Sequence, residues 1–252
     1  MELQARRSGG VIIGKDVLQL MKDRYGIDCS LKSAYNHLKR AKLVWISARS
    51  RYPNSNPEEQ EEFKKNREKV ENTLPKTGPI NGVEIWFQDE ARFGQQGSLT
   101  RLWAIKGTRP RAVRQQQFKY TYLFGAVSPE RGDAVGLLWS YANKDRMGIH
   151  LGYIFSQIPS GRHAVVVLDN SGWHTTKKWP NFQNLTLLAL PAASPELNPC
   201  EQVWKYLRRT RLSNRTFKDE EELLDACSDA WNELTDEPAQ VSSLTSRSWA
   251  RL

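Results

Sequence analysis

The sequence predicts a mixed α/β (α+β) protein, in which a mixed sheet is flanked by helices and preceded by a small helix-turn-helix unit. Three observations predict it. Apolar strand patterns alternate with amphipathic helix patterns from about residue 80 onward. The first 52 residues instead carry two short helical patterns and most of the net charge. With 252 residues, 39% of them hydrophobic, the chain is long enough for one sizeable core and a small second domain.

The predicted elements of the body follow one another in a clear order. A strand comes first and ends in acids, two strands joined by a Pro-Gly turn follow, and an amphipathic helix comes next. Two near-continuous apolar runs then have the pattern of parallel strands buried on both faces. Two helical stretches close the chain. In order, these segments are 83–90, 119–140, 145–158, 164–169, 185–191, 200–212 and 220–234.

The N-terminal unit is strongly basic. Residues 1–52 hold 11 Lys and Arg against 4 Asp and Glu, a balance of +7 out of a total of +9. Val17, Leu20 and Met21 have helical spacing up to Gly26, and Ser30 is a suitable N-cap for a second helix. A basic pair of helices with a tight connection is typical of a DNA-binding helix-turn-helix, although a solvated helix hairpin has the same pattern.

The outer face of the second helix carries polar and basic side chains suited to phosphates and base edges. The predicted DNA-binding residues there are Lys32, Ser33, Asn36, His37, Lys39 and Arg40. A segment rich in Pro, Ser and Asn and then a highly charged helix follow this unit. The expected organisation is therefore a helix-turn-helix domain over 1–52, a linker with a charged helix over 53–79, and a catalytic domain over 80–252.

Composition also excludes several classes of protein. No apolar run approaches the roughly 18 residues that cross a bilayer, and the N-terminus lacks the apolar stretch of a signal peptide. We therefore expect an intracellular protein that makes no membrane contact. The three cysteines are far apart and include no C-x-x-C pair, so neither a disulfide framework nor a zinc site is predicted.

Three carboxylates fall at or just past the ends of predicted core strands. Asp89 ends the first strand, Asp169 ends the fourth, and Glu201 follows the loop after the fifth. Open α/β sheets keep their sites at this edge. An acid after a buried strand needs a partner, and three convergent carboxylates favour a hard cation such as Mg²⁺. The alternative for each acid alone is a turn cap or an ion pair with a nearby Arg or Lys.

Glu201 also has a local interpretation. In SPELNPCEQVW, Asn198 is placed as the N-cap, Pro199 as the first helical residue and Glu201 as the third, a variant of the capping box. The two interpretations are compatible, because the start of the helix directs Glu201 toward the two aspartates.

Four segments together resemble a known family. FQDEARFG, LWAIKGTRPR, VVLDNSGWHTT and SPELNPCEQVWKYLR, in this order, resemble the catalytic domain of DDE transposases of the mariner superfamily, on the bacterial insertion-sequence branch. The resemblance covers about residue 80 to the last helix. It implies a ribonuclease-H-like fold with Asp89, Asp169 and Glu201 as catalytic, metal-binding residues.

The resemblance also implies an activity. It implies metal-dependent DNA cleavage at transposon ends and strand transfer into a short target, typically TA, with two Mg²⁺ ions roughly 4 Å apart, for which Mn²⁺ can substitute. The partners would be double-stranded DNA, as terminal repeats and target, and a second copy of the chain in a homodimer. The expected location is the bacterial cytoplasm, associated with the nucleoid.

Other residues near the motifs have supporting roles in this interpretation. Lys106, Arg109 and Arg111 are expected to bind DNA phosphates, as Lys177 is, while Trp173 is a stacking candidate that fits the core better. Glu90 and Glu196 are expected beside the metal ligands or in solvent. Asn170 and His174 are left open between supporting the site and a structural role.

The chain departs from the family in one respect. Members usually carry two helix-turn-helix units, whereas this sequence has room for one before the charged helix. The two explanations are a truncated copy and an open reading frame whose first part lies elsewhere. Two alternatives remain. One is a ribonuclease-H-like nuclease or resolvase without strand transfer, and the other is a catalytically silent DNA-binding remnant.

Overall fold

The computed structural model describes residues 12–45, 54–65, 74, 82–169 and 182–250. By its internal contacts the chain divides into two compact units, Met1–Arg51 and Tyr52–Leu252. In the part of the chain that the structure describes, no helix is long and apolar enough to cross a membrane.

The N-terminal unit contains the two predicted helices. Helix α2 spans Gly14–Tyr25 and ends at Gly26, whose φ of 64° is the left-handed conformation that glycine adopts without strain. Helix α3 spans Leu31–Arg40, and the Ser30 side chain caps it by accepting a hydrogen bond of 3.2 Å from the Ser33 amide. The two helices pack against each other, so the predicted helix pair is confirmed.

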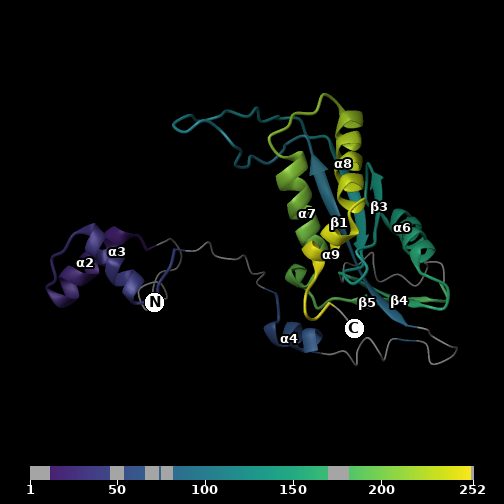
Figure 1. Cartoon of the computed structure of the whole chain (residues 1–252), viewed down its shortest axis with the longest axis horizontal. Coiled ribbons are helices and arrows are strands. Elements are labelled where there is room, and N and C mark those ends of the chain that lie inside the picture. The colour runs from purple at the N-terminus through teal and green to yellow at the C-terminus, as the bar shows by residue number, and fades with distance from the viewer. Residues whose placement is uncertain (1–11, 46–53, 66–73, 75–81, 170–181, 251–252) are drawn as a thin grey trace. The chain divides into compact units, whose positions relative to one another are not determined.

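The second unit is built on a five-stranded mixed sheet (Figure 1). Its strand order is β3-β2-β1-β4-β5; β1 pairs antiparallel with β2 and parallel with β4, β2–β3 is antiparallel and β4–β5 is parallel. The strands are β1 Val83–Gly94, β2 Tyr120–Val127, β3 Ala134–Trp139, β4 His163–Leu168 and β5 Leu185–Ala189.

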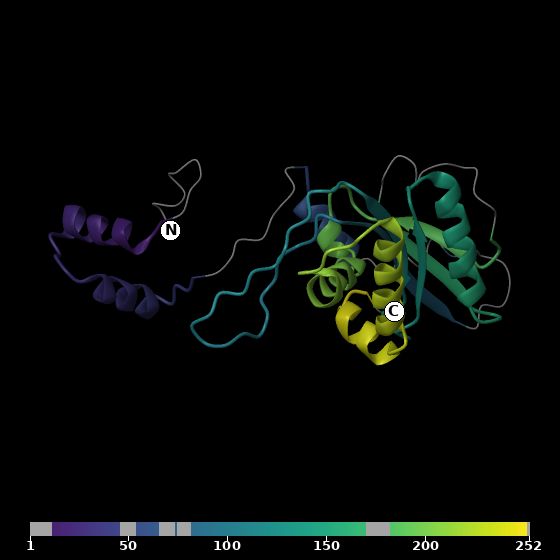
Figure 2. The ribbon, with the colours of Figure 1, turned by 90° about the horizontal axis from the view of Figure 1, so that it is seen from above.

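Helices cover both faces of this sheet (Figure 2). On one face lies α6, Lys144–Gln157, and on the other lie α7, Cys200–Leu207, α8, Glu220–Thr235, and α9, Pro238–Thr245. Alternate residues of a strand point to opposite faces, so β1 contributes to two cores. Trp86 is buried against α6, and Phe87 is buried on the side of α7 and α8.

Most of the predicted elements are present, with some differences. Strand β5 is half-buried rather than buried on both faces, because it lies at the edge of the sheet. Helix α9 was not predicted. The stretch after α7 continues as a π-helical turn, Arg208–Leu212, and the charged linker helix is described as α4, Pro57–Lys65.

Candidate active site

Asp89 lies within strand β1 and not at its end. The sequence placed the strand end at the acids, but β1 continues to Gly94 because its last residues pair with β2 as far as Tyr120. The side chain of Asp89 points to the face covered by α7, where the indole Nε1 of Trp204 donates a hydrogen bond of 2.9 Å to Oδ2. A helix residue 115 positions away thus fixes the orientation of this carboxylate.

The electrostatic environment of Asp89 opposes its charge. The pKa of Asp89 is raised from 3.8 to about 7, chiefly by burial and in smaller part by the neighbouring charges of Glu90 and Glu201, against the lowering effect of the Trp204 hydrogen bond. A cation beside the carboxylate would stabilise its charged form. Within the described part of the chain, no basic group is among the causes of this shift, which distinguishes Asp89 from an acid held in an ion pair with one of those residues.

A glycine makes room for Trp204. Gly125 lies opposite Asp89 in the β1–β2 register, and the Trp204 ring passes directly over it. A Cβ atom at position 125 would overlap the end of that ring and approach Trp231 to 3.0 Å. The close approach of α7 to the sheet, and with it the bond to Asp89, therefore requires glycine at this position.

The start of α7 is attached to β1 by side-chain hydrogen bonds. Asn198 donates from Nδ2 to the Gln88 carbonyl at 2.8 Å, and its Oδ1 accepts from the Cys200 amide at 3.1 Å. The thiol of Cys200 donates to the Phe87 carbonyl at 2.9 Å. These bonds hold the first turn of α7, which carries Glu201, beside the part of β1 that carries Asp89.

The capping interpretation of this turn is half right. Asn198 does bind an amide of the first turn, but α7 begins at Cys200 and its N-cap is Pro199. Glu201 makes no capping bond, because the Asn198 amide already donates to the Pro195 carbonyl at 2.9 Å. The Glu201 carboxylate is therefore left to face the pocket.

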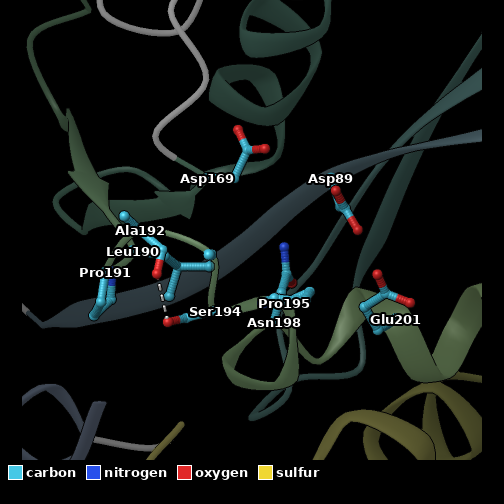
Figure 3. A pocket seen from close by; sticks show the side chains of 10 residues that line it. Asp89, Asp169, Leu190, Pro191, Ala192, Ser194, Pro195, Asn198 and Glu201 are labelled. Atoms are coloured by element: carbon cyan, nitrogen blue, oxygen red, sulfur yellow. Dashed lines mark hydrogen bonds between the residues drawn. The ribbon is translucent and has the colours of Figure 1, made fainter. Parts of the chain in front are cut away.

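The three predicted carboxylates line one pocket of about 380 Å³ (Figure 3). Glu201 and Asp89 point toward one another, and Asp169, which directly follows β4, lies on another side of the pocket. The loop after β5 closes the pocket with Leu190, Pro191, Ala192, Ala193, Ser194 and Pro195. The structure thus gathers residues from β1, β4 and α7 at one place.

The three carboxylates share the pocket without forming a tight cluster. Among the described residues, no group of three His, Cys, Asp or Glu side chains is arranged so as to hold a metal ion. In Figure 3 the Asp169 carboxylate points away from that of Glu201. Like charges repel, so carboxylates draw together only around a cation.

Glu90 and Glu196, the two acids expected beside the metal ligands or in solvent, both lie close to the pocket. Glu90 is next to Asp89 in β1, accepts a hydrogen bond of 2.9 Å from Gln88 Nε2, and is among the charges that raise the pKa of Asp89. Glu196 accepts a hydrogen bond of 2.7 Å from Gln60 Nε2, and Gln60 also donates to Ser194 Oγ at 2.9 Å. Helix α4 thus contacts the loop that lines the pocket, a contact that the sequence did not predict.

The expected DNA-binding side chains occupy two exposed surfaces. On α3, Lys32, Asn36, His37, Lys39 and Arg40 are exposed and Ser33 is partly buried. Lys106, Arg109 and Arg111 are exposed on the arm, the long segment 95–119 that connects β1 to β2 (Figure 1). Asn170, Trp173, His174 and Lys177 lie outside the described residues.

The root of the arm is attached to the segment after α7. Asn214 accepts from the Thr100 amide at 3.0 Å and donates to its carbonyl at 3.1 Å, and Gln115 makes two bonds to the Phe217 backbone, each of 2.6 Å. Gln95 donates to the Phe217 carbonyl at 3.0 Å. Both sides of the arm therefore start from a fixed position near the helix that carries Glu201.

The fold and pocket are those of a DDE endonuclease, and comparison with known families agrees. The model of the DDE superfamily endonucleases matches residues 84–224, so the chain belongs to this family. A winged helix-turn-helix model matches residues 12–67. The assignment inferred from four short motifs is thus confirmed at the level of the DDE superfamily, and the likeness to solved mariner structures confirms the fold class.

The chain is also similar to particular proteins. The uncharacterized protein y4pE/y4sA of Sinorhizobium fredii is 44% identical over 131 residues, which cover 52% of this chain and 97% of that protein. Among solved structures, the Mos1 strand transfer complex matches with a TM-score of 0.59 and 15% identity, over 95% of this chain and 76% of that one. The Mos1 mariner paired-end complex with Mn matches equally well, at 16% identity over the same shares. The Mos1 structures show the shared fold.

Proposed function

We propose that this protein is a transposase that cleaves DNA at the ends of an insertion sequence and joins those ends to a TA-type target. The observation that carries the proposal is the convergence of Asp89, Asp169 and Glu201 on one pocket in a chain of the DDE endonuclease family. Similar solved chains were captured as a strand transfer complex and as a paired-end complex with a transposon end.

Divalent cations fit the residues that line the pocket. The charged donors are carboxylate oxygens, which Mg²⁺ and Mn²⁺ prefer, and relatives of the same fold were solved with both metals. The raised pKa of Asp89 reflects, besides burial, the negative charges of Glu90 and Glu201, which a cation in the pocket would offset. Asp89, Asp169 and Glu201 are the residues that would hold two ions.

Each part of the chain has a distinct role in the reaction. When bound, the ions supply the positive charge that activates a water or a 3′-hydroxyl and stabilises the leaving oxygen of a phosphodiester. Trp204 keeps the Asp89 carboxylate oriented, and Asn198 holds the turn that carries Glu201 against β1. The carboxylates must be ionised to act as ligands, so activity should rise with pH as Asp89 loses its proton.

DNA is held by surfaces outside the pocket. Helix α3, with Lys32, Asn36 and Arg40 exposed, is suited to the major groove, and the arm supplies Lys106, Arg109 and Arg111 for phosphates. We assign recognition of the terminal repeats to residues 1–52, connection to 53–79 and catalysis to 80–252. Two copies of the chain, one for each transposon end, would form the active homodimer.

The test uses DNA carrying the element's own terminal repeats. Wild-type protein should nick this DNA only when Mg²⁺ or Mn²⁺ is present, and should join pre-cleaved ends to a plasmid target. Glu201→Gln should abolish both reactions, whereas Glu196→Gln, which alters a carboxylate on the same loop that does not line the pocket, should leave both intact. Nicking without joining would reduce the proposal to a nuclease, and wild-type nicking by Glu201→Gln would overturn the assigned site.

A further inference from the structure

A strip of aromatic side chains crosses the sheet on the face opposite to the pocket. Tyr122 on β2 pairs in register with Trp139 on β3. Tyr120 packs edge-on against Tyr122 with ring centroids 5.7 Å apart, and Tyr141 packs edge-on against Trp139 at 6.4 Å. These four rings are called the aromatic strip below.

An arginine lies at each end of the aromatic strip. The guanidinium carbon of Arg92 lies 5.2 Å from the centroid of Tyr120. At the other end the guanidinium carbon of Arg146 lies 3.7 Å from the centroid of Trp139, and Nη2 donates to the Tyr141 hydroxyl at 3.1 Å. Neither arginine forms an ion pair with any residue that the structure describes. Both therefore keep their positive charge available.

The outer rings of the strip are accessible. Tyr120 is 43% exposed and Tyr141 is 48% exposed, while Tyr122 and Trp139 are partly buried beneath them. Tyrosine, tryptophan and arginine side chains held in this way offer flat surfaces at little further entropic cost, because their positions are already fixed by their neighbours.

The strip lies close to the pocket along β1. Arg92 follows Asp89 by three residues, which is about 10 Å along a strand, and their side chains project from opposite faces. The arm leaves the sheet just beyond Arg92, after Gly94, and returns to it at Tyr120. A flexible strand that passes around this end of the sheet would reach the strip from the pocket.

The charge around the strip indicates what binds there. Between Glu90 and Glu130 the sequence holds seven Lys and Arg and no Asp or Glu, and this segment includes Arg92, Tyr120, Tyr122 and the whole arm. Such a surface is complementary to a polyanion. Aromatic rings beside free guanidinium groups bind single strands, since every unpaired base has a face that can stack.

We propose that the aromatic strip, with Arg92 and Arg146, binds single-stranded DNA on the sheet face opposite to the cleavage pocket, with unpaired bases against Tyr120 and Tyr141 and phosphates against the two arginines. This inference rests on the proposed function, because it takes DNA as the substrate of the pocket. It adds a substrate form, an unpaired strand, to the duplex that the helix-turn-helix unit would hold.

The first test measures binding of a labelled oligothymidylate of about 15 nucleotides to the full chain in the presence of EDTA, which removes cleavage from the measurement. The variant Tyr120→Ala/Tyr141→Ala should raise Kd by about tenfold or more, because stacking contributes about 1–3 kcal/mol per base. Tyr120→Phe/Tyr141→Phe, which keeps both rings, should bind as wild type does. Tyr153→Ala, a similarly exposed tyrosine on α6 two helical turns beyond Arg146, is the matched control.

The second test locates the strand directly. An oligonucleotide containing 5-iodouracil should crosslink on irradiation to residues of the strip, as mapped by mass spectrometry. Equal binding by the alanine and phenylalanine variants, or crosslinks confined to the arm or to α3, would overturn the proposal. A third outcome would also overturn it: an alanine variant whose mass in light scattering differs from that of wild type but whose affinity for the oligonucleotide does not. The strip would then contact a second copy of the chain and not DNA.

The outcome separates this inference from the proposed function. Glu201→Gln should bind and crosslink the oligonucleotide as wild type does, since it changes only the pocket. Wild-type cleavage of terminal-repeat DNA combined with unchanged binding by the alanine variant would remove the single-strand site and leave the transposase. Binding at the strip without any metal-dependent cleavage would remove the transposase and leave the site.

Discussion

Two carboxylates on strand β1, five residues apart, have opposite environments. Each accepts a hydrogen bond from an indole, Glu84 from Trp86 at 2.8 Å and Asp89 from Trp204 at 2.9 Å. Glu84 is fully buried and also receives Arg131 at 3.0 Å and Arg162 at 3.2 Å. Asp89 instead has Glu90 and Glu201 as its charged neighbours.

The difference shows how a structural acid is distinguished from a site acid. The charge of Glu84 is compensated by the protein, so no cation is needed there and none would be attracted. No basic side chain that the structure describes pairs with Asp89, and its carboxylate opens on a pocket with two further acids. Acids grouped as they are around Asp89 destabilise the folded protein when no cation is bound. Such a group is therefore expected where it serves a function.

The largest expected effect is on catalysis. Asp89→Asn keeps the shape of the side chain but removes its charge, so DNA cleavage should fall by about three orders of magnitude or more while folding is retained. Glu84→Gln should change cleavage per folded molecule very little. Nicking of terminal-repeat DNA, normalised to the folded fraction, measures both. Comparable losses in the two variants would erase the distinction between the acids.

The next largest effect is on stability, for which substitution of Glu84 should cost more than substitution of Asp89. Glu84→Gln removes the buried charge that two partly exposed arginines face, while Arg131 keeps its ion pair with Asp133, so the free energy of unfolding should fall by about 1–3 kcal/mol. Urea denaturation followed by tryptophan fluorescence measures it. Glu130→Gln, an exposed neighbour of Arg131, is the control and should change little. A mild effect at Glu84 would mean that its ion pairs are dispensable.

Stability should also depend on pH through Asp89. Its folded pKa of about 7 lies above the ordinary value of 3.8, so the folded state holds this proton more tightly than the unfolded state does. In EDTA this contribution is full below about pH 4 and is lost as pH rises to about 7, by roughly 4 kcal/mol at most. Asp89→Asn should lack this pH-dependent contribution, so the stability of the variant relative to wild type should increase as pH rises from about 4 to about 7. A difference that stays constant across denaturation curves at several pH values would contradict the raised pKa.

The smallest expected effect tests how Asp89 is held. Gly125→Ala should push Trp204 away from Asp89 and lower the free energy of unfolding by about 1–3 kcal/mol through overpacking. Cleavage should fall by about 10- to 100-fold, as when a group that orients a metal ligand is disturbed. Gly152→Ala on α6, where no neighbouring atom lies within 4 Å of the added Cβ, should be neutral or stabilising. Unchanged cleavage in Gly125→Ala would show that the Trp204 bond is not needed.

Much of the fold was predictable because its signals are local. The helix pair of the N-terminal unit follows from Gly26 and Ser30, which act on their own neighbours in the chain. The apolar runs that form β1 and β4 are recognisable for the same reason. Four short motifs, read in order, were enough to place the chain in its family and to select Asp89, Asp169 and Glu201.

The sequence by itself thus determined the element types, the basic N-terminal unit and the three acids of the pocket. Only the tertiary structure decided which acid on β1 is compensated, because Arg131 and Arg162 reach Glu84 from 47 and 78 residues away. It also decided that Trp204 orients Asp89 and that Asn198 binds β1, 110 residues distant, instead of closing a capping box with Glu201. Local propensity follows from each residue and its neighbours, whereas compensation of a buried charge depends on side chains that only folding brings within hydrogen-bond distance.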